Sequence, residues 1–246
     1  MAEFQTFDGI RLIYEVHGEG EPVVLLHGFA ADSFINWEQP GVVAALTEAG
    51  YSVIALDARG HGRSDKPHEE AAYANRAMVK DVQILLDELS LDRSKVIGYS
   101  MGALVTLGLL TDEPRVSAAV IGGMGDRALG PMDHGDIPEA LIADDPSLFS
   151  ENAQEYRAFA DATQADRQAL FAAMRAGAEP ADPAVLKKIR TPVLVICGDG
   201  DTVVGDPAEL AGALGNASSV VVEGDHLSAV TDPLFAKSMI KFLDAN

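Results

Sequence analysis

Cysteine is nearly absent from this chain of 246 residues, where Cys197 is the only one. No disulfide can form within the chain, which suits a reducing compartment. Residues 1–5 show neither the basic region nor the apolar segment of a secretory signal. No apolar run approaches the roughly 18 residues of a membrane span. We therefore predict a cytoplasmic protein without a membrane partner, and we place Cys197 in the core because it lies within an apolar run.

Basic residues are also scarce. Lys and Arg total 18 against 38 Asp and Glu, so the formal net charge is −20 at pH 7. Such a surface repels phosphate backbones and anionic lipid head groups, which excludes nucleic acid as a partner. We interpret the acidity as a well-solvated surface, and it leaves the oligomeric state open. Hydrophobic residues make up 48% of the chain, which is enough for the core of a globular protein.

Motifs for metals, redox centres and nucleotides are missing as well. The chain contains no H-E-x-x-H, no pair of cysteines and no G-x-x-x-x-G-K. The glycines at positions 20, 28 and 60 do not form a dinucleotide-binding fingerprint. We therefore expect no metal and no cofactor.

Short apolar runs alternate with helix-length stretches along the chain. Runs rich in β-branched residues are typical of strands that are covered on both faces, and hence of a parallel sheet. Asp8-Gly9 separates the first two runs and indicates a hairpin. Apolar residues recur at helical spacing in 78–89, 101–110 and 233–243, so helices connect the strands of one sheet. We predict an α/β fold with a mostly parallel eight-stranded sheet and helices on both faces, with strands at residues 4–7, 11–16, 23–26, 53–56, 96–97, 118–121, 193–197 and 220–222.

One stretch breaks this rhythm. About 70 residues separate the strand at 118–121 from the strand at 193–197, whereas such connections usually have about 2–6. We predict that residues 127–186 form an inserted helical cap on a core of residues 1–126 and 187–246. A long crossover packed on the sheet edge is the alternative. Phe159 and Phe171 are candidate substrate contacts, because both belong to the amphipathic pattern of this stretch.

The sequence Gly98-Tyr99-Ser100-Met101-Gly102 matches the pattern G-x-S-x-G. It follows a predicted strand and opens a predicted helix, which is the setting of a nucleophile elbow. Glycines permit the tight turn that lifts a serine hydroxyl out of the sheet. The N-terminus of the helix then directs free N–H groups at any negative charge that develops there. Ser100 is therefore the candidate nucleophile.

A serine hydroxyl is a weak nucleophile and needs a base. Of the six histidines, His226 follows the last predicted strand, at the carboxyl end of the sheet, where sites form in open α/β sheets. We therefore predict that His226 is the general base. We interpret His17 and His68 as exposed loop residues, and His134 lies in the predicted cap.

The base needs a carboxylate on its other ring nitrogen. Asp201, which follows the penultimate strand, is our choice, because it completes the chain order Ser, Asp, His of this kind of elbow. Asp126, after an earlier strand, is the main alternative. Asp225 is too close to His226 along the chain to reach its far ring nitrogen, and we expect Asp199 to cap its own turn through local backbone hydrogen bonds.

These motifs together resemble the α/β-hydrolase fold family over nearly the whole chain. His27-Gly28-Phe29 resembles the family's oxyanion turn, and residues 57–64, D-A-R-G-H-G-R-S, resemble its D-x-R-G-x-G-x-S turn. The resemblance implies that the backbone N–H groups of Phe29 and Met101 form the oxyanion hole. It also implies that His27, His61 and Arg59 have structural roles, although the residues alone leave a substrate contact from His27 open.

The resemblance also implies a chemistry. Family members that open epoxides or displace halide carry an aspartate at the elbow, so Ser100 disfavours those reactions. We predict a serine hydrolase, similar to a carboxylesterase, that cleaves a small uncharged ester through an acyl-enzyme. The alternatives are a C–C bond hydrolase, a lactonase or a perhydrolase that uses the same triad. A slow small-molecule receptor of the same fold is the alternative of another class, and the turnover number separates it from an enzyme.

Overall fold

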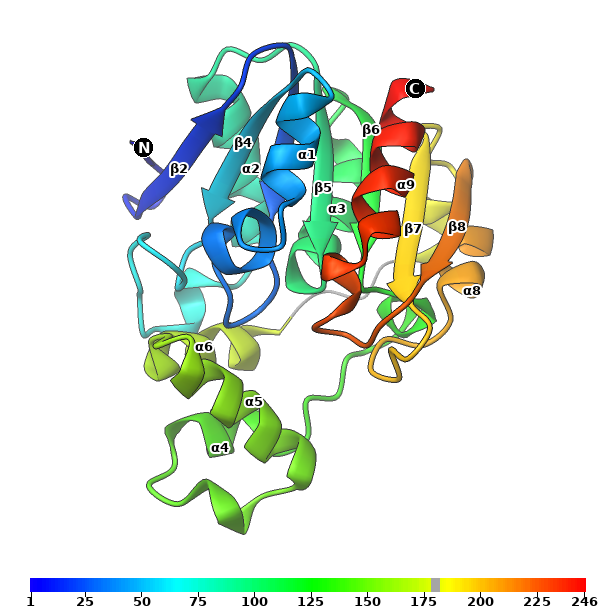
Figure 1. Cartoon of the computed structure of the whole chain (residues 1–246). Helices are drawn as coiled ribbons and strands as arrows, with labels where there is room; N and C mark the ends of the chain where they lie inside the picture. The colour runs from blue at the N-terminus through cyan, green and yellow to red at the C-terminus, as the bar shows by residue number, and fades with distance from the viewer. Residues whose placement is uncertain (178–181) are drawn as a thin grey trace.

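The fold is built on one eight-stranded sheet, seen in the computed structural model of the protein (Figure 1). The structure describes residues 1–177 and 182–246, so residues 178–181 of the predicted cap lie outside it. The strand order is β1-β2-β4-β3-β5-β6-β7-β8, and only β2 runs opposite to the others. The predicted mostly parallel sheet is confirmed, with strands β1 (Ala2–Gln5), β2 (Arg11–His17), β3 (Glu21–Leu26), β4 (Tyr51–Asp57), β5 (Ser94–Tyr99), β6 (Val116–Gly122), β7 (Val193–Gly198) and β8 (Ala217–Val222).

The central strands are covered on both faces. Every residue of β5 and β7 is buried, as the continuous apolar runs predict. Strand β5 begins two residues earlier than expected, at Ser94 and Lys95, although both are polar. The Lys95 ammonium donates to the carbonyl of Leu243 (2.8 Å), and the Ser94 hydroxyl donates to the carbonyl of Pro22 (3.3 Å). Because tertiary partners satisfy these polar groups, the strand continues where hydropathy alone ends it.

Helices cover both faces of the sheet, as predicted (Figure 1). On one face, Trp37 packs with Leu46 and with Phe235, Met239 and Leu243 of the C-terminal helix. On the other face, apolar residues of three helices form a second core cluster with β3, β5 and β7. The first face carries η1 (Phe34–Glu38, a π-helix), α1 (Val42–Glu48) and α9 (Pro233–Asp244), and the second carries α2 (Ala77–Glu88), α3 (Met101–Asp112) and α8 (Pro207–Ala213).

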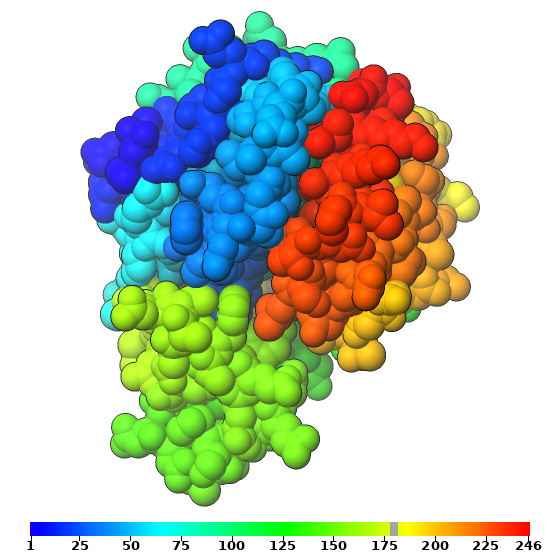
Figure 2. Space-filling view, in the orientation of Figure 1, coloured from blue at the N-terminus to red at the C-terminus, as the bar shows by residue number. Residues whose placement is uncertain are grey.

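The stretch between β6 and β7 is mostly helical. Helices α4 to α6 pack on one another around a third apolar cluster that also includes Phe29 and Ala30. They form a lobe beyond the carboxyl ends of the parallel strands (Figures 1 and 2). At the two ends of the predicted cap, Ala128 and Leu186 pack instead with the core of the sheet. The elements of this stretch are η3 (Asp126–Leu129), α4 (Ile137–Ile142), η4 (Pro146–Leu148), α5 (Glu151–Ala162), α6 (Arg167–Ala176) and α7 (Pro183–Leu186).

Arg59 ties three parts of the core together. Its side chain is fully buried and forms a double hydrogen bond with Asp81 on α2, at 2.6 and 2.7 Å. It also pairs with Asp8 in the β1–β2 turn (2.9 Å) and donates to the carbonyl of Ala72 in η2 (Glu70–Ala72). Buried charges need such partners, and Arg59 accordingly has a structural position. None of the helices formed by the described residues is long and apolar enough to cross a membrane.

Candidate active site

Ser100 stands at the sharp turn between β5 and α3. Its φ of 51° and ψ of −109° place it in a backbone conformation that residues other than glycine rarely adopt. The flanking glycines are required by packing: a Cβ at Gly98 would collide with the carbonyl of Gly102, and a Cβ at Gly102 would collide with that of Leu26. The G-x-S-x-G sequence therefore forms the elbow that its pattern predicts, at the carboxyl edge of the sheet.

Ser100, His226 and Asp201 form one hydrogen-bonded line. The Nε2 atom of His226 lies 3.0 Å from the Oγ atom of Ser100, and its Nδ1 atom lies 2.8 Å from Oδ2 of Asp201. The other carboxylate oxygen of Asp201 accepts the N–H of Val203 (3.0 Å), and the Asp201 side chain is fully buried. A carboxylate on Nδ1 keeps the proton there, which leaves Nε2 as an acceptor for the serine hydroxyl.

The other aspartates considered have different partners. Asp126 accepts the N–H of Asp206 (2.7 Å), and Asp225 accepts the N–H groups of Leu227 and Ser228 in its own turn. The expectation that Asp199 caps its own turn is wrong. Its carboxylate accepts the N–H of Gly224 (3.1 Å), in the loop that carries His226. The loops after β7 and β8 lie side by side, so a carboxylate from one can satisfy the backbone of the other.

Tyr99 holds the histidine loop, and the sequence analysis did not single it out. Its hydroxyl donates to the backbone carbonyl of His226 (2.8 Å), and its ring centroid lies 5.7 Å from the imidazole. The ring lies against Gly122 and Gly123, where an added Cβ would come within 2.8 Å of it. Burial raises the pKa of Tyr99, so its hydroxyl stays protonated and able to donate. Its position in the sequence, directly before Ser100, was the one feature that could have drawn attention to it.

The predicted oxyanion turn is held by its neighbours. Gly28 donates its N–H to Oδ1 of Asn36 on η1 (2.7 Å), a buried residue that the sequence analysis missed. The carbonyl of Gly28 accepts from Nδ1 of His27 (2.8 Å), whose Nε2 accepts the N–H of Ala58 (3.0 Å). Both ring nitrogens of His27 are thus engaged with backbone. In the part of the chain that the structure describes, the N–H groups of Phe29 and Met101 donate no hydrogen bond.

His61 lies beneath this turn. Its Nδ1 atom donates to the carbonyl of Arg59 (2.9 Å), and its ring packs against those of His27 and Phe29, with centroids at 5.1 and 5.8 Å. Burial, followed by the nearby His27, lowers the pKa of His61 to about 3. Burial likewise lowers the pKa of His27. Both histidines are therefore neutral at physiological pH and support the turn as uncharged groups.

The cap residues differ in how close they come to the site. The ring of Tyr156, on α5, lies 6.2 Å from that of Phe29. Burial and the charge of Asp201 raise the pKa of Tyr156. Phe159 is half-buried and packs in the α4–α6 cluster together with Phe29, whereas Phe171 is half-buried on α6. Tyr156 is thus a pocket candidate that the sequence analysis treated only as part of an amphipathic pattern.

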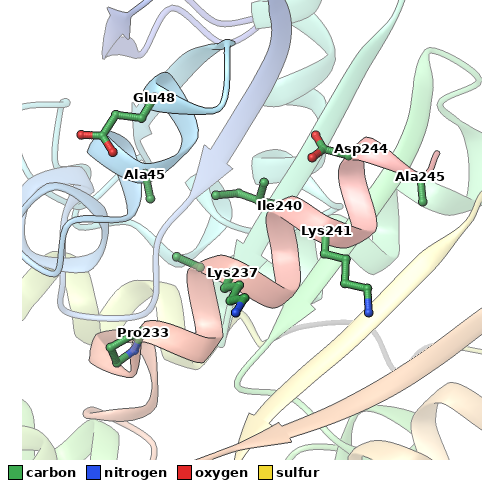
Figure 3. A pocket seen from close by; sticks show the side chains of 9 residues that line it. Ala45, Glu48, Pro233, Lys237, Ile240, Lys241, Asp244 and Ala245 are labelled. Atoms are coloured by element: carbon green, nitrogen blue, oxygen red, sulfur yellow. The ribbon is translucent and has the colours of Figure 1, made fainter.

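A separate groove of about 620 Å³ runs between α1 and α9 (Figure 3). Ile240 and Ala45 lie along it, with Lys237 and Lys241 on one side and Glu48 on the other. None of the predicted site residues lines it. The groove is therefore unconnected with the chemistry of Ser100.

Known proteins are similar to this chain in sequence and in fold. A family model described as the alpha/beta hydrolase fold matches residues 21–182. A candidate carbamate hydrolase of Variovorax paradoxus is 42% identical over 113 residues, which are 45% of this chain and 41% of that protein. Epoxide hydrolase B of Mycobacterium tuberculosis is 38% identical over 104 residues, which are 42% of this chain and 28% of that protein. The matched segments thus span less than half of these relatives. An esterase from Exiguobacterium antarcticum shares the fold, with a TM-score of 0.81, 23% identity and 99% of both chains covered.

Proposed function

The chain belongs to the α/β-hydrolase fold family, and we propose that it is a serine hydrolase that cleaves a small, uncharged ester through an acyl-enzyme. The observation that carries this proposal is the line from Ser100 through His226 to Asp201, with contacts of 3.0 and 2.8 Å. Nucleophile and base at this separation, with the base oriented by a carboxylate, are what acyl transfer requires.

The first half of the reaction forms the acyl-enzyme. The Oγ atom of Ser100 bonds to the ester carbonyl carbon while its proton moves to Nε2 of His226. The N–H groups of Phe29 and Met101, which have no partner among the described residues, stabilise the oxyanion. The tetrahedral intermediate then collapses: the bond to the alkoxy oxygen breaks, and His226 gives its proton to the departing alcohol.

The second half releases the acid. A water molecule loses a proton to Nε2 of His226, and its oxygen bonds to the acyl carbon. The bond to Ser100 then breaks, and the proton returns to the serine oxygen. The carboxylate of Asp201, hydrogen-bonded to Nδ1, stabilises the imidazolium that forms in each half. No group outside this chain is needed other than water.

We also propose that residues 127–186 act as a cap that sets substrate choice, on a core of residues 1–126 and 187–246. Support comes from α4–α6, whose apolar cluster includes Phe29 of the oxyanion turn. Phe159, Phe171 and Tyr156 are the proposed substrate contacts. An apolar lining of this kind fits an uncharged acyl or alkyl group.

The likeness to an epoxide hydrolase does not extend to the nucleophile that epoxide opening uses in this family. Here the elbow carries Ser100 where that reaction needs an aspartate, so ester cleavage is the better supported chemistry. C–C bond, lactone and peracid chemistries use the same triad, so only the choice of substrate distinguishes them from ester cleavage.

The test is a panel of activated esters and lactones of graded acyl length, assayed with and without a serine-directed phosphonate. We expect turnover of the short esters, stoichiometric loss of activity with the phosphonate, and the added mass on the peptide that contains Ser100. Ser100→Ala is the control: it should fold normally, resist labelling and lose nearly all hydrolysis. Label on another residue, or Ser100→Ala with about a tenth of the wild-type rate or more, would contradict the proposal.

A further inference from the structure

Glu15, His17 and Glu38 meet on the face of the sheet that carries η1. Glu15 and His17 are two residues apart on β2, so both side chains point to the same face. Glu38 is the last residue of the π-helix η1. Each of the three offers one ligand atom, and these atoms all lie within 4.8 Å of one another. The interpretation of His17 as an exposed loop residue is therefore wrong, because it ends a strand and its side chain is mostly covered, with 28% exposed.

The ring nitrogen at the centre of this cluster lacks a hydrogen bond. The Nε2 atom of His17 is inaccessible to water and has no hydrogen-bond partner among the described residues. Two carboxylate oxygens lie near it, Oε2 of Glu15 at 3.5 Å and Oε1 of Glu38 at 3.9 Å, and both distances are beyond normal hydrogen-bond length. A buried polar atom without a partner is costly, so a group that bridges the nitrogen and both oxygens would stabilise the cluster.

The spacing suits a small cation. The Nε2 atom of His17 lies 3.5 Å from Oε2 of Glu15 and 3.9 Å from Oε1 of Glu38, and one ligand atom from each of the three residues lies within 4.8 Å of the other two. Because zinc–ligand bonds are about 2.0–2.2 Å, two atoms bound to the same ion can lie at most about 4.4 Å apart. The site needs only a slight contraction to bind an ion. Glu15 is already oriented for this, because Arg63 donates to its Oε1 (2.6 Å) and Oε2 remains directed at His17. The two glutamate carboxylates outnumber the Arg63 guanidinium, so the cluster carries a net negative charge.

We propose that Glu15, His17 and Glu38 form a binding site for a divalent transition-metal ion such as Zn²⁺. An imidazole nitrogen with two carboxylate oxygens is a donor set for zinc or manganese, whereas calcium and magnesium prefer oxygen ligands alone. Water would complete the coordination. The site is distinct from the line of Ser100, His226 and Asp201, so its role is structural rather than catalytic.

The bound ion links η1 to β2. Asn36, two residues before Glu38 on η1, accepts the N–H of Gly28 in the predicted oxyanion turn (2.7 Å). An ion that holds Glu38 against His17 therefore also limits the movement of Asn36. We expect metal binding to raise the thermal stability of the protein.

The experiment is isothermal titration of the metal-stripped full chain with ZnCl₂, and with MgCl₂ as the comparison ion, followed by thermal unfolding with and without each. Wild type should bind Zn²⁺ and unfold at a higher temperature in its presence. His17→Gln and Glu38→Gln each replace a strong ligand group with a neutral amide, which is a weaker ligand, and should weaken this binding at least about tenfold. His68→Gln is the matched control, because His68 is a half-exposed histidine 3.1 Å from Asp166, outside the cluster. It should bind Zn²⁺ as wild type does.

Two results would overturn the proposal. Zn²⁺ binding of equal strength in wild type, His17→Gln and Glu38→Gln would place the ion elsewhere. The absence of Zn²⁺ binding by wild type would show that the cluster is not a metal site. If His17→Gln fails to fold, Glu38→Gln decides, because Glu38 lies at the end of a surface helix and its amide has nearly the same shape.

Discussion

At the scale of single residues, the site depends on which group each polar atom reaches. Asp199 and Asp201 stand two positions apart in one turn, yet only Asp201 meets the ring of His226, while Asp199 accepts the N–H of Gly224. Residue type and proximity along the chain do not separate these two aspartates. Their hydrogen-bond partners distinguish them, and we assign the two aspartates different roles on that basis.

Asp201→Asn tests this assignment. An amide at this position leaves the histidine in the wrong tautomer, so we expect turnover to fall by about 10⁴. Asp199→Asn should reduce turnover far less, because its partner is a backbone N–H outside the triad. Turnover on an activated ester, measured at saturating substrate for both variants, gives the comparison. If Asp126→Asn proves the crippling change and Asp201→Asn is mild, the triad is completed from the earlier strand.

Tyr99→Phe tests the hydrogen bond that holds the histidine loop. The change keeps the ring against Gly122 and Gly123 but removes the donor to the carbonyl of His226. Small displacements of a catalytic base are costly, so we expect kcat to fall by about tenfold, with little change in KM because the hydroxyl does not touch substrate.

Tyr51→Phe is the matched control for Tyr99→Phe. Its hydroxyl donates to Asp244 (2.7 Å), away from the triad, so kcat should stay at the wild-type value. The rate of phosphonate labelling at Ser100 provides a second measurement. Equal effects of both tyrosine changes on kcat would indicate general destabilisation rather than positioning of the histidine.

At the scale of elements, the loops and helices at the carboxyl edge of the sheet bring the site together. Strand β5 and helix α3 present Ser100, and the loops after β7 and β8 supply Asp201 and His226. The turn after β3, held by η1, places Gly28 beside Ser100, because a Cβ added at Gly28 would lie 3.5 Å from Cβ of Ser100. Helices α4–α6 pack against this last turn, which gives the lobe direct contact with the predicted oxyanion hole.

Phe159→Ala tests the proposed role of the lobe. Phe159 packs in the cluster that contains Phe29, so a smaller side chain should alter the preference between acetate and octanoate esters. A change in pocket volume of this kind is worth about 1–3 kcal/mol, so we expect the ratio of the two kcat/KM values to shift by at least about tenfold. Phe171→Ala measures the contribution of α6. Parallel losses on both esters would point to a packing defect instead of a specificity contact.

At the scale of the whole molecule, buried polar groups make the stability of the fold depend on pH. His61 and His27 are buried, and their pKa values are lowered, that of His61 to about 3. In the unfolded chain a histidine takes up a proton at about pH 6.5, the pKa of the free side chain. Between these two pH values the unfolded state therefore binds more protons, and the free energy of unfolding falls as the pH falls.

His61→Asn should make this dependence shallower. The amide of asparagine can still donate to the carbonyl of Arg59, as Nδ1 of His61 does at 2.9 Å, but it does not titrate. We expect the free energy of unfolding to fall less between about pH 6.5 and pH 4 than in wild type. Urea unfolding at several pH values measures the slope. A slope of His61→Asn equal to that of wild type would contradict the idea.

The sequence by itself determined the class of fold and the sharp turn that carries Ser100. Continuous apolar runs can bury both faces only in a covered sheet, and the glycines around Ser100 are required wherever that turn forms. These properties depend on neighbours along the chain, which a sequence displays. The places of Ser100 and His226 were predictable for the same reason, because each follows a recognisable strand, whereas the same rule left more than one aspartate as a partner for His226.

Only the tertiary structure decided which distant groups meet. The donor from Tyr99 to the His226 loop joins residues 127 positions apart, and Asn36 reaches Gly28 because η1 folds back over the turn. His17 was interpreted as a loop residue until pairing placed it at the end of β2, facing Glu38 of η1. Hydrogen bonds and charge pairs act over a few ångströms of space rather than along the chain, so contacts between remote segments depend on packing that no local pattern encodes.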